Sequence, residues 1–268
     1  DEKLHGEIVG AVDDEVVLLH QVEGIRRVEE LIVGIHLHVR IDGQYLLLGA
    51  LYLGAVHILR EMDHLTLISN LISPEYRDKV SKRLNNRLRA AKLIGCPADL
   101  DECKDSKERE YLPSGIPQLL ATMDFIARGY NLCILGASDT GKTYLAKAIG
   151  IKACQDYRVG YYHCEELLES LSSMKQIEYS KYERKMTAIL KQDLVILDDF
   201  LLHTIEDESE IKVLFALLEG RTEKQKSTII CSQRAPENWK PMIMNDEISA
   251  NSIVKRATKH YTVMINSR

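Results

Sequence analysis

Short apolar runs alternate with longer stretches of helical periodicity through the second half of the chain. Four to six mostly apolar residues bounded by polar ones are typical of parallel strands that are buried on both faces. The longer stretches place apolar residues three or four positions apart, which indicates amphipathic helices. The runs interpreted as strands cover residues 131–135, 159–164, 193–198, 227–232 and 261–265, and the helical stretches cover 144–154, 165–174, 179–191 and 208–219. Strands that alternate with helices predict an α/β fold with a five-stranded parallel sheet flanked by helices.

The first predicted strand leads directly into a glycine-rich loop. Its residues are Gly136, Ala137, Ser138, Asp139, Thr140, Gly141, Lys142 and Thr143. They fit the pattern G-x-x-x-x-G-K-[ST], in which backbone N–H groups surround the phosphates of a nucleoside triphosphate. In such loops the lysine reaches the β- and γ-phosphates, the threonine hydroxyl ligates Mg²⁺, and the next helix directs its positive end at the anion. A plain turn between core elements is the alternative, but the flanking strand and helix favour an ATP site.

Two carboxylates end the predicted strand 193–198, at the edge where open parallel sheets bind ligands. Asp198 is expected to hold Mg²⁺, directly or through water, and Asp199 to orient the attacking water. A strand that ends in an ordinary polar turn is the alternative, and the position after a phosphate loop argues against it. The strand 227–232 also ends in polar residues, so Ser232 or Gln233 is a candidate sensor of the γ-phosphate. The sequence does not choose between them.

With these residues in place, the chain from about residue 67 to its end resembles the IstB-like ATPases. These are helper proteins of a bacterial transposon family, related to DnaC helicase loaders within the AAA+ class. The resemblance is carried by GASDTGKTYLA, by DLVILDDF, by STIICSQ with Glu237-Asn238-Trp239 after it, and by NSIVKRATKHY. It implies an AAA+ P-loop NTPase fold preceded by a small helical region. It also implies ATP hydrolysis with Mg²⁺, a homo-oligomer on DNA, and regulation of a transposase.

The same resemblance gives Arg256 a role that the sequence alone does not suggest. By itself Arg256 reads as a surface residue of a basic helix. In the family an arginine at this place acts as an arginine finger, which stabilises transition-state charge in the site of a neighbouring subunit. The resemblance therefore implies that each active site is completed between two subunits.

Two positions depart from the family pattern close to the nucleotide. Asp139 and Leu201 stand where glycine is usual. A carboxylate beside a triphosphate is repulsive, and residues other than glycine adopt positive φ at a cost. These departures leave open a non-catalytic ATP- and DNA-binding adaptor. A DnaC-like helicase loader is a second alternative, which differs only in its protein partner. A small-molecule kinase is disfavoured by the paired carboxylates and by the lack of a recognisable lid.

A basic amphipathic helix is predicted over residues 75–94, beginning at Pro74. Its apolar stripe consists of Val80, Leu84, Leu88 and Ala91, and the remainder holds seven Lys or Arg against two acidic residues. Arginines on such a face contact DNA phosphates without reading the base sequence. We therefore expect non-specific duplex binding through Arg83, Arg87 and Arg89; a solvated helix face is the alternative.

The formal net charge of −5 is unevenly distributed. Residues 1–66 contain 5 Lys/Arg and 12 Asp/Glu, whereas the remainder contains 30 and 28. The first quarter matches no part of the family, and His36 and His38 within it lack a third metal ligand. We divide the chain into an atypical N-terminal segment (1–66), a basic helical region and linker (67–112), and an AAA+ ATPase domain (113–268). Residues 106–110 read as the linker.

The remaining composition fits a cytoplasmic protein without a membrane partner. The six cysteines form no C-x-x-C pair, so reduced thiols are expected, with Cys133 and Cys231 as packing residues of core strands. The start shows no secretory signal pattern, and the apolar stretch 45–59 is too short to span a bilayer. Trp239 is expected to pack in the core.

Overall fold

The computed structural model describes residues 64–243 and 247–267. The chain divides into two units, Asp1–Pro74 and Glu75–Arg268, and the second unit contains every candidate site residue. The His36–His38 pair and almost all of the atypical segment 1–66 lie outside the described residues.

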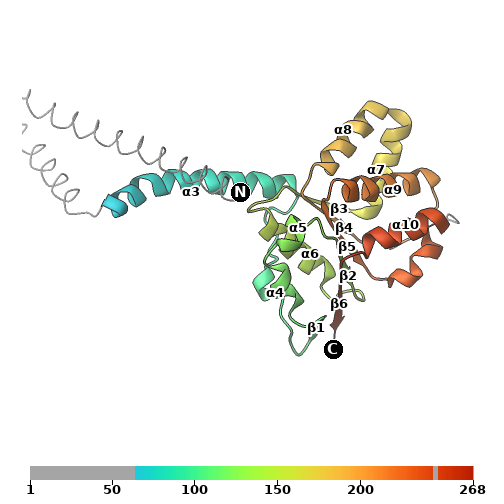
Figure 1. Ribbon diagram of the computed structural model, residues 1–268, viewed down its shortest axis with the longest axis horizontal. Helices are drawn as coiled ribbons and strands as arrows, with labels where there is room; N and C mark the ends of the chain where they lie inside the picture. The colour runs from blue at the N-terminus through green and yellow to red at the C-terminus, as the bar shows by residue number, and fades with distance from the viewer. Residues whose placement is uncertain (1–63, 244–246, 268) are drawn as a thin grey trace, which may run out of the picture. The chain divides into compact units, whose positions relative to one another are not determined.

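A six-stranded sheet forms the centre of the second unit, in the order β1-β6-β2-β5-β4-β3 (Figure 1). The strands are β1 (Arg109–Leu112), β2 (Leu132–Leu135), β3 (Val159–His163), β4 (Leu194–Asp198), β5 (Ser227–Ser232) and β6 (Tyr261–Ser267). The last five are parallel and correspond to the five predicted strands. β1 is an additional edge strand, antiparallel to β6. Part of the predicted linker 106–110 therefore belongs to the sheet.

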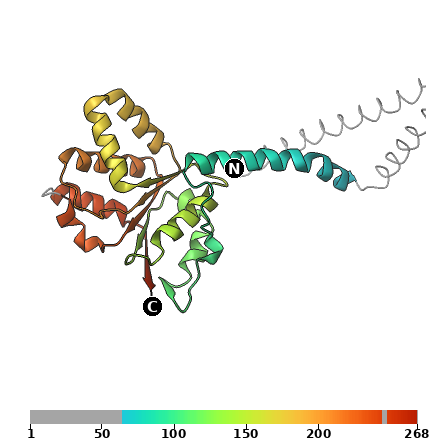
Figure 2. The same ribbon diagram turned by 180° about the vertical axis from the view of Figure 1, so that it is seen from behind.

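Helices cover both faces of this sheet (Figures 1 and 2). Side chains alternate along each strand: Ile134 and Ile196 pack on the face covered by α6, and Cys133 and Val195 on the other face. On the α6 side lie α4 (Ile116–Leu120), α5 (Asp124–Ala127) and α6 (Lys142–Ala153). On the other side lie α7 (Cys164–Ile177), α8 (Tyr179–Leu190), α9 (Glu208–Glu223) and α10 (Glu247–Ala257). The helical stretches predicted from periodicity are all confirmed.

Asn131 fixes the start of β2, the strand that leads into the phosphate loop. Its Oδ1 accepts the Thr228 N–H (2.9 Å) and its Nδ2 donates to the Arg256 carbonyl (2.8 Å). Its own N–H donates to His260 Nδ1 (3.0 Å). One nearly buried amide thus joins β2 to β5 and to the end of α10, which satisfies polar groups that would otherwise be costly to bury.

The basic helix α3 (His64–Ala90) begins before Pro74, so the predicted start is wrong. The prediction placed Pro74 at the helix start because proline has no backbone N–H to donate. The division between the two units falls at this residue. The helix ends as a Schellman motif with Lys92 at φ 57°, where the Leu93 N–H donates to the Leu88 carbonyl (2.8 Å). The predicted apolar stripe contacts the core from Leu84 onward, whereas Val80 is 45% exposed.

Several core predictions are confirmed. Trp239 is fully buried against Phe200, and its Nε1 donates to the Arg234 carbonyl (2.9 Å). Cys133 and Cys231 are buried strand residues, and burial raises the pKa of the Cys133 thiol to about 12. Among residues 64–243 and 247–267, no helix is long and apolar enough to cross a membrane.

Candidate functional site

The phosphate loop leaves the C-terminal end of β2 and enters α6 at Lys142. Gly136 has φ 157°, and a Cβ there would lie 2.5 Å from the Ile265 carbonyl oxygen. Gly141 has φ 98° and forms the N-cap of α6. Both positions exclude larger residues, which keeps backbone N–H groups accessible to an anion at the positive end of the helix. This geometry fits the phosphates of a nucleotide.

Lys142 folds back over the loop that precedes it. Its Nζ donates to the Ala137 carbonyl at 2.5 Å, and the Thr140 hydroxyl donates to the same oxygen at 3.0 Å. Burial lowers the pKa of the Lys142 ammonium, against which nearby acidic groups, Asp198 among them, raise it. The side chains of residues 137–139 are exposed, so the tip of the loop is open to solvent.

The carboxylate of Asp198 joins the phosphate loop to the predicted acidic strand end. Asp198 is 1% exposed at the end of β4. Its Oδ1 accepts the Thr143 hydroxyl at 3.1 Å, and its Oδ2 accepts the Tyr161 hydroxyl at 2.6 Å. Burial and this hydrogen bond both raise the pKa of the Tyr161 phenol, so it acts as a donor. The structure therefore brings together the two residues proposed to hold Mg²⁺.

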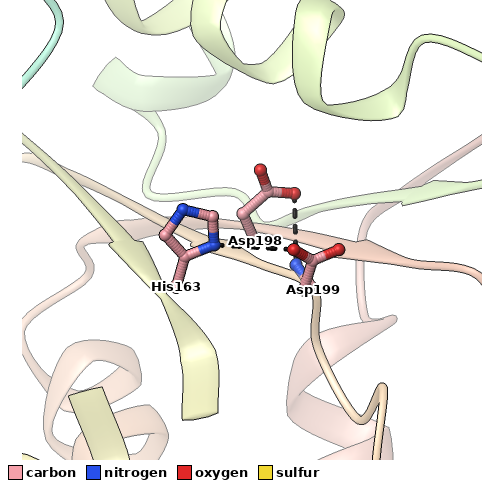
Figure 3. A group of neighbouring side chains, drawn as sticks. All are labelled: His163, Asp198 and Asp199. Carbon is pink, nitrogen blue, oxygen red and sulfur yellow. Dashed lines mark hydrogen bonds and ion pairs between the residues drawn. The ribbon is translucent and has the colours of Figure 1, made fainter. Parts of the chain in front are cut away.

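Asp199 and His163 extend this cluster toward solvent (Figure 3). The Asp199 N–H donates to Asp198 Oδ1 at 3.1 Å, and Asp199 Oδ2 lies 3.5 Å from His163 Nδ1. One potential ligand atom from each of His163, Asp198 and Asp199 lies within 4.8 Å of the others. Carboxylate oxygens suit Mg²⁺, and imidazole suits transition metals better. The two carboxylates, together with the Thr143 hydroxyl that bonds Asp198, fit a hard divalent cation.

The end of β5 separates the two sensor candidates. The Ser232 hydroxyl is buried and donates to the Phe200 carbonyl at 2.8 Å, in the turn that follows Asp199. This bond gives Ser232 a structural function. Gln233 is exposed directly after β5, which lies between β2 and β4 in the sheet. Gln233 is thus the candidate whose side chain is accessible between the two halves of the site.

Both departures from the family pattern fall on left-handed backbone. Asp139 has φ 60° and Leu201 has φ 52°. Asp199, the residue expected to orient water, has φ 53°. Residues with a Cβ adopt this region at a cost of about 1 kcal/mol or more, which glycine does not pay. Asp139 is exposed, whereas Leu201 is 3% exposed in the core beside the site.

Arg256 is held by contacts within its own chain. Its Nη2 lies 3.0 Å from Glu219 Oε1, its Nη1 also donates to the Ser252 hydroxyl, and its guanidinium stacks 5.0 Å from the Phe215 ring centroid. The side chain keeps 23% of its surface exposed. The arginine therefore lies on the α9–α10 surface, pre-positioned by a carboxylate.

The basic residues of α3 do not all face solvent. Arg87 is half-buried, and its Nη1 donates to the carbonyls of Cys154 (3.2 Å) and Gln155 (2.5 Å) after α6. A cation at these carbonyls stabilises the negative end of that helix. Arg83 and Arg89 are exposed. Arg83 also lines a shallow groove of about 500 Å³, together with Lys79, Lys82, Asn86, Arg87 and Ala90.

Three residues near the site were missed from the sequence. Tyr161 and His163 reach Asp198 and Asp199 only because β3 pairs with β4 in a register that sets His163 opposite Asp198. Alternation along 159–163 was the available signal, since it places Tyr161 and His163 on one face. Arg109 lies against Gly141, and nothing in its local sequence marks it.

Known proteins resemble this chain over most of its length. Residues 55–267 match the family model of IstB-like ATP binding proteins. An insertion sequence ATP-binding protein of Sinorhizobium fredii is 33% identical over 196 residues, which cover 73% of this chain and 76% of the relative. The ATP-binding protein of insertion sequence IS21 from Pseudomonas aeruginosa is 26% identical over 206 residues, 76% of this chain and 75% of the relative.

Solved structures show the same fold. The replication initiator DnaA bound to AMPPCP and single-stranded DNA has a TM-score of 0.52 at 18% identity, over 65% of this chain and 51% of the DnaA chain. DnaI has a TM-score of 0.50 at 20% identity, over 64% of this chain and 89% of that chain. At such identities the likeness shows the fold, an α/β sheet flanked by helices, and no more.

Proposed function

This chain belongs to the IstB-like ATP-binding protein family, and we propose that it is an ATP-hydrolysing helper of transposition that assembles on duplex DNA and regulates a transposase. The observation that carries the proposal is the hydrogen bond from Thr143 to Asp198. It links the residue expected to ligate a metal after the phosphate loop with the carboxylate at the end of β4, which is the pairing that phosphoryl transfer requires.

Each site residue then has one task. The loop N–H groups and Lys142 would bind the triphosphate, and Thr143 and Asp198 would hold Mg²⁺, which when bound neutralises charge on the phosphates. Asp199 would accept a hydrogen bond from the attacking water and so orient it. Gln233 would contact the γ-phosphate between the two strand ends. Ser232 would support this arrangement through its bond to the Phe200 carbonyl.

ATP hydrolysis measured with and without duplex DNA tests the enzymatic part of the proposal. Lys142→Ala removes the phosphate-binding ammonium, and Lys152→Ala at the other end of α6 serves as a matched control. We expect turnover by the wild type and the control, stimulated by DNA, and loss of turnover in Lys142→Ala. Equal rates in wild type and Lys142→Ala would refute hydrolysis at this site.

For DNA, we propose phosphate contacts from the exposed arginines Arg83 and Arg89, with Arg87 holding the helix in place. Replacing Arg83 and Arg89 by Gln should weaken binding to unrelated duplexes equally and reduce the dependence of affinity on salt. A sequence-selective loss, or no change in the salt dependence, would contradict this interface.

For the oligomer, we propose that Arg256 reaches the nucleotide of a neighbouring subunit, with Glu219 directing its guanidinium before assembly. Mixing Arg256→Ala subunits with Lys142→Ala subunits should then restore part of the activity, because some interfaces would pair an intact loop with an intact arginine. Absence of restoration at every mixing ratio would refute a shared site.

The rival function is a non-catalytic ATP- and DNA-binding adaptor. It is favoured by the left-handed backbone at Asp139 and Asp199, because a carboxylate near the phosphates and a strained water-orienting residue both oppose rapid turnover. The two functions separate in one comparison: the adaptor binds ATP as tightly as the enzyme, yet its hydrolysis rate equals that of Lys142→Ala. Co-purification with a transposase or a replicative helicase identifies the protein partner in either case.

A further inference from the structure

Arg109 lies directly against the phosphate loop, although it precedes the loop by a long stretch of chain. A Cβ placed on Gly141 would lie 3.0 Å from Arg109 Cζ and 3.2 Å from each of its Nη atoms. The guanidinium therefore packs on the last glycine before Lys142. No role in nucleotide binding was expected for this residue, because it falls in the segment read as a linker.

The backbone around Arg109 is firmly held. In β1, Arg109 pairs with Ser267 of β6, and its carbonyl accepts the Ser106 N–H at 2.8 Å. Tyr111, two residues along and on the same strand face, is fully buried, and its N–H donates to Asp105 Oδ1 at 2.7 Å. These contacts fix the position from which the Arg109 side chain reaches Gly141.

Positive groups gather around Gly141, and the carboxylates of Asp139, Asp198 and Asp199 near Lys142 offset part of their charge. Gly141 caps the N-terminus of α6, which carries the positive end of the helix dipole, and the Lys142 ammonium follows at once. A guanidinium beside them adds a third positive charge of the same sign. A polyphosphate would be attracted to these positive groups, and the planar guanidinium matches phosphate oxygens in a bidentate manner.

We propose that Arg109 is a second phosphate-binding cation of the nucleotide site, which contacts the phosphates of bound ATP or ADP beside Lys142. This inference rests on the proposed ATP site. It assigns to β1, the edge strand that the sequence did not predict, the function of carrying a charge to the phosphate loop.

Nucleotide affinity measured by calorimetry on the full chain tests the proposal. Arg109→Gln should weaken Mg-ATP and Mg-ADP by about tenfold, roughly the effect of losing one charge-assisted contact. Arg109→Lys, which keeps the charge and loses the fork, should weaken them less. Adenosine, which has no phosphate, should bind equally to all variants. Arg128→Gln, an exposed arginine after α5, is the control and should match wild type.

The outcomes are distinct. If wild type binds ATP and Arg109→Gln binds it equally well, the role of Arg109 is refuted while the proposed function stands. If Arg109→Gln loses adenosine and ATP to the same degree, the residue is structural and the inference also fails. If wild type does not bind ATP, the proposed function and this inference fall together. Thermal unfolding without nucleotide verifies that Arg109→Gln and Arg109→Lys remain folded.

Discussion

Replacing Tyr161 by Phe should weaken the hold on Asp198, the carboxylate proposed to bind Mg²⁺, without altering the phosphate loop. The Tyr161 hydroxyl donates to Asp198 Oδ2 at 2.6 Å, and both side chains are almost completely buried. A hydrogen bond to a charged group contributes roughly 1.5–3 kcal/mol, and burial of Asp198 limits the access of water that could replace the lost donor. We expect Tyr161→Phe to lower the free energy of unfolding by about 2 kcal/mol.

The adjacent tyrosine provides a matched control. Tyr162 faces the opposite side of the sheet, and its hydroxyl exchanges hydrogen bonds with Gln192 at 3.0 and 3.2 Å. A neutral, partly buried bond of this kind contributes only about 0.5–1.5 kcal/mol. Urea unfolding should therefore show a smaller loss for Tyr162→Phe than for Tyr161→Phe.

Mg²⁺ dependence distinguishes a site role from a purely structural one. Partners that orient metal ligands typically change metal affinity or activity by about 10- to 100-fold when removed. Tyr161→Phe should raise the Mg²⁺ concentration for half-maximal ATP hydrolysis by about tenfold, and Tyr162→Phe should leave it unchanged. Equal Mg²⁺ dependence in the two variants would refute the positioning of Asp198 by Tyr161.

Three further predictions concern backbone strain, a helix end and pH. Asp139→Gly should bind ATP more tightly, and its free energy of unfolding should be unchanged or up to ~1 kcal/mol higher. Leu201→Gly should lower the free energy of unfolding by about 2 kcal/mol, because the burial of Leu201 outweighs its backbone strain. Denaturation and ATP titration measure these changes, and a stabilised Leu201→Gly would contradict the ranking. Arg87→Ala should lower the free energy of unfolding by about 1–3 kcal/mol, because it loses the hydrogen bonds to the end of α6. Arg83→Ala should change it by no more than about 0.5 kcal/mol. Similar unfolding curves for the two variants would refute the capping role of Arg87. Burial lowers the pKa of His260, whose Nδ1 accepts a backbone N–H, so the unfolded chain takes up protons near pH 6.5 that the native imidazole resists. Stability should fall as pH drops below about 6.5, and His260→Gln should show a shallower fall between pH 7 and 5; identical slopes would show that His260 does not contribute.

The parallel sheet and the phosphate loop could be predicted because their signals are local. A run of buried strand residues followed by a glycine loop and a helix is visible within about twenty positions. β1 could not be predicted in this way, since Arg-Glu-Tyr-Leu is short and half polar, and its pairing with β6 joins residues at opposite ends of the domain.

The contacts of individual polar residues could not be predicted from the local sequence. Arg87 was expected to contact DNA, which stays a prediction, and its bonds to the carbonyls after α6 were not foreseen, because the side of a helix that faces protein depends on how α3 packs. Ser232 and Gln233 were equivalent in sequence, and only the turn after Asp199 gives the serine a partner. The roles of Asp199, Gln233 and Arg256 in catalysis stay predictions.

At the two positions that depart from the family pattern, the sequence did indicate the backbone conformation. The sequence identified Asp139 and Leu201 as positions where glycine is usual, and the structure gives both a left-handed backbone. The resemblance thus carried conformational information that propensity alone did not, since leucine disfavours positive φ and aspartate adopts it only in a minority of cases.

The central claim is that the Thr143–Asp198 pairing forms a hydrolytic site. Steady-state ATP hydrolysis with saturating Mg²⁺ and duplex DNA, compared between wild type and Asp198→Asn, tests it most directly. We predict turnover by the wild type and a rate at the background level for Asp198→Asn, which should still bind ATP through the intact phosphate loop. Equal rates for the two proteins, with ATP bound to both, would contradict the account.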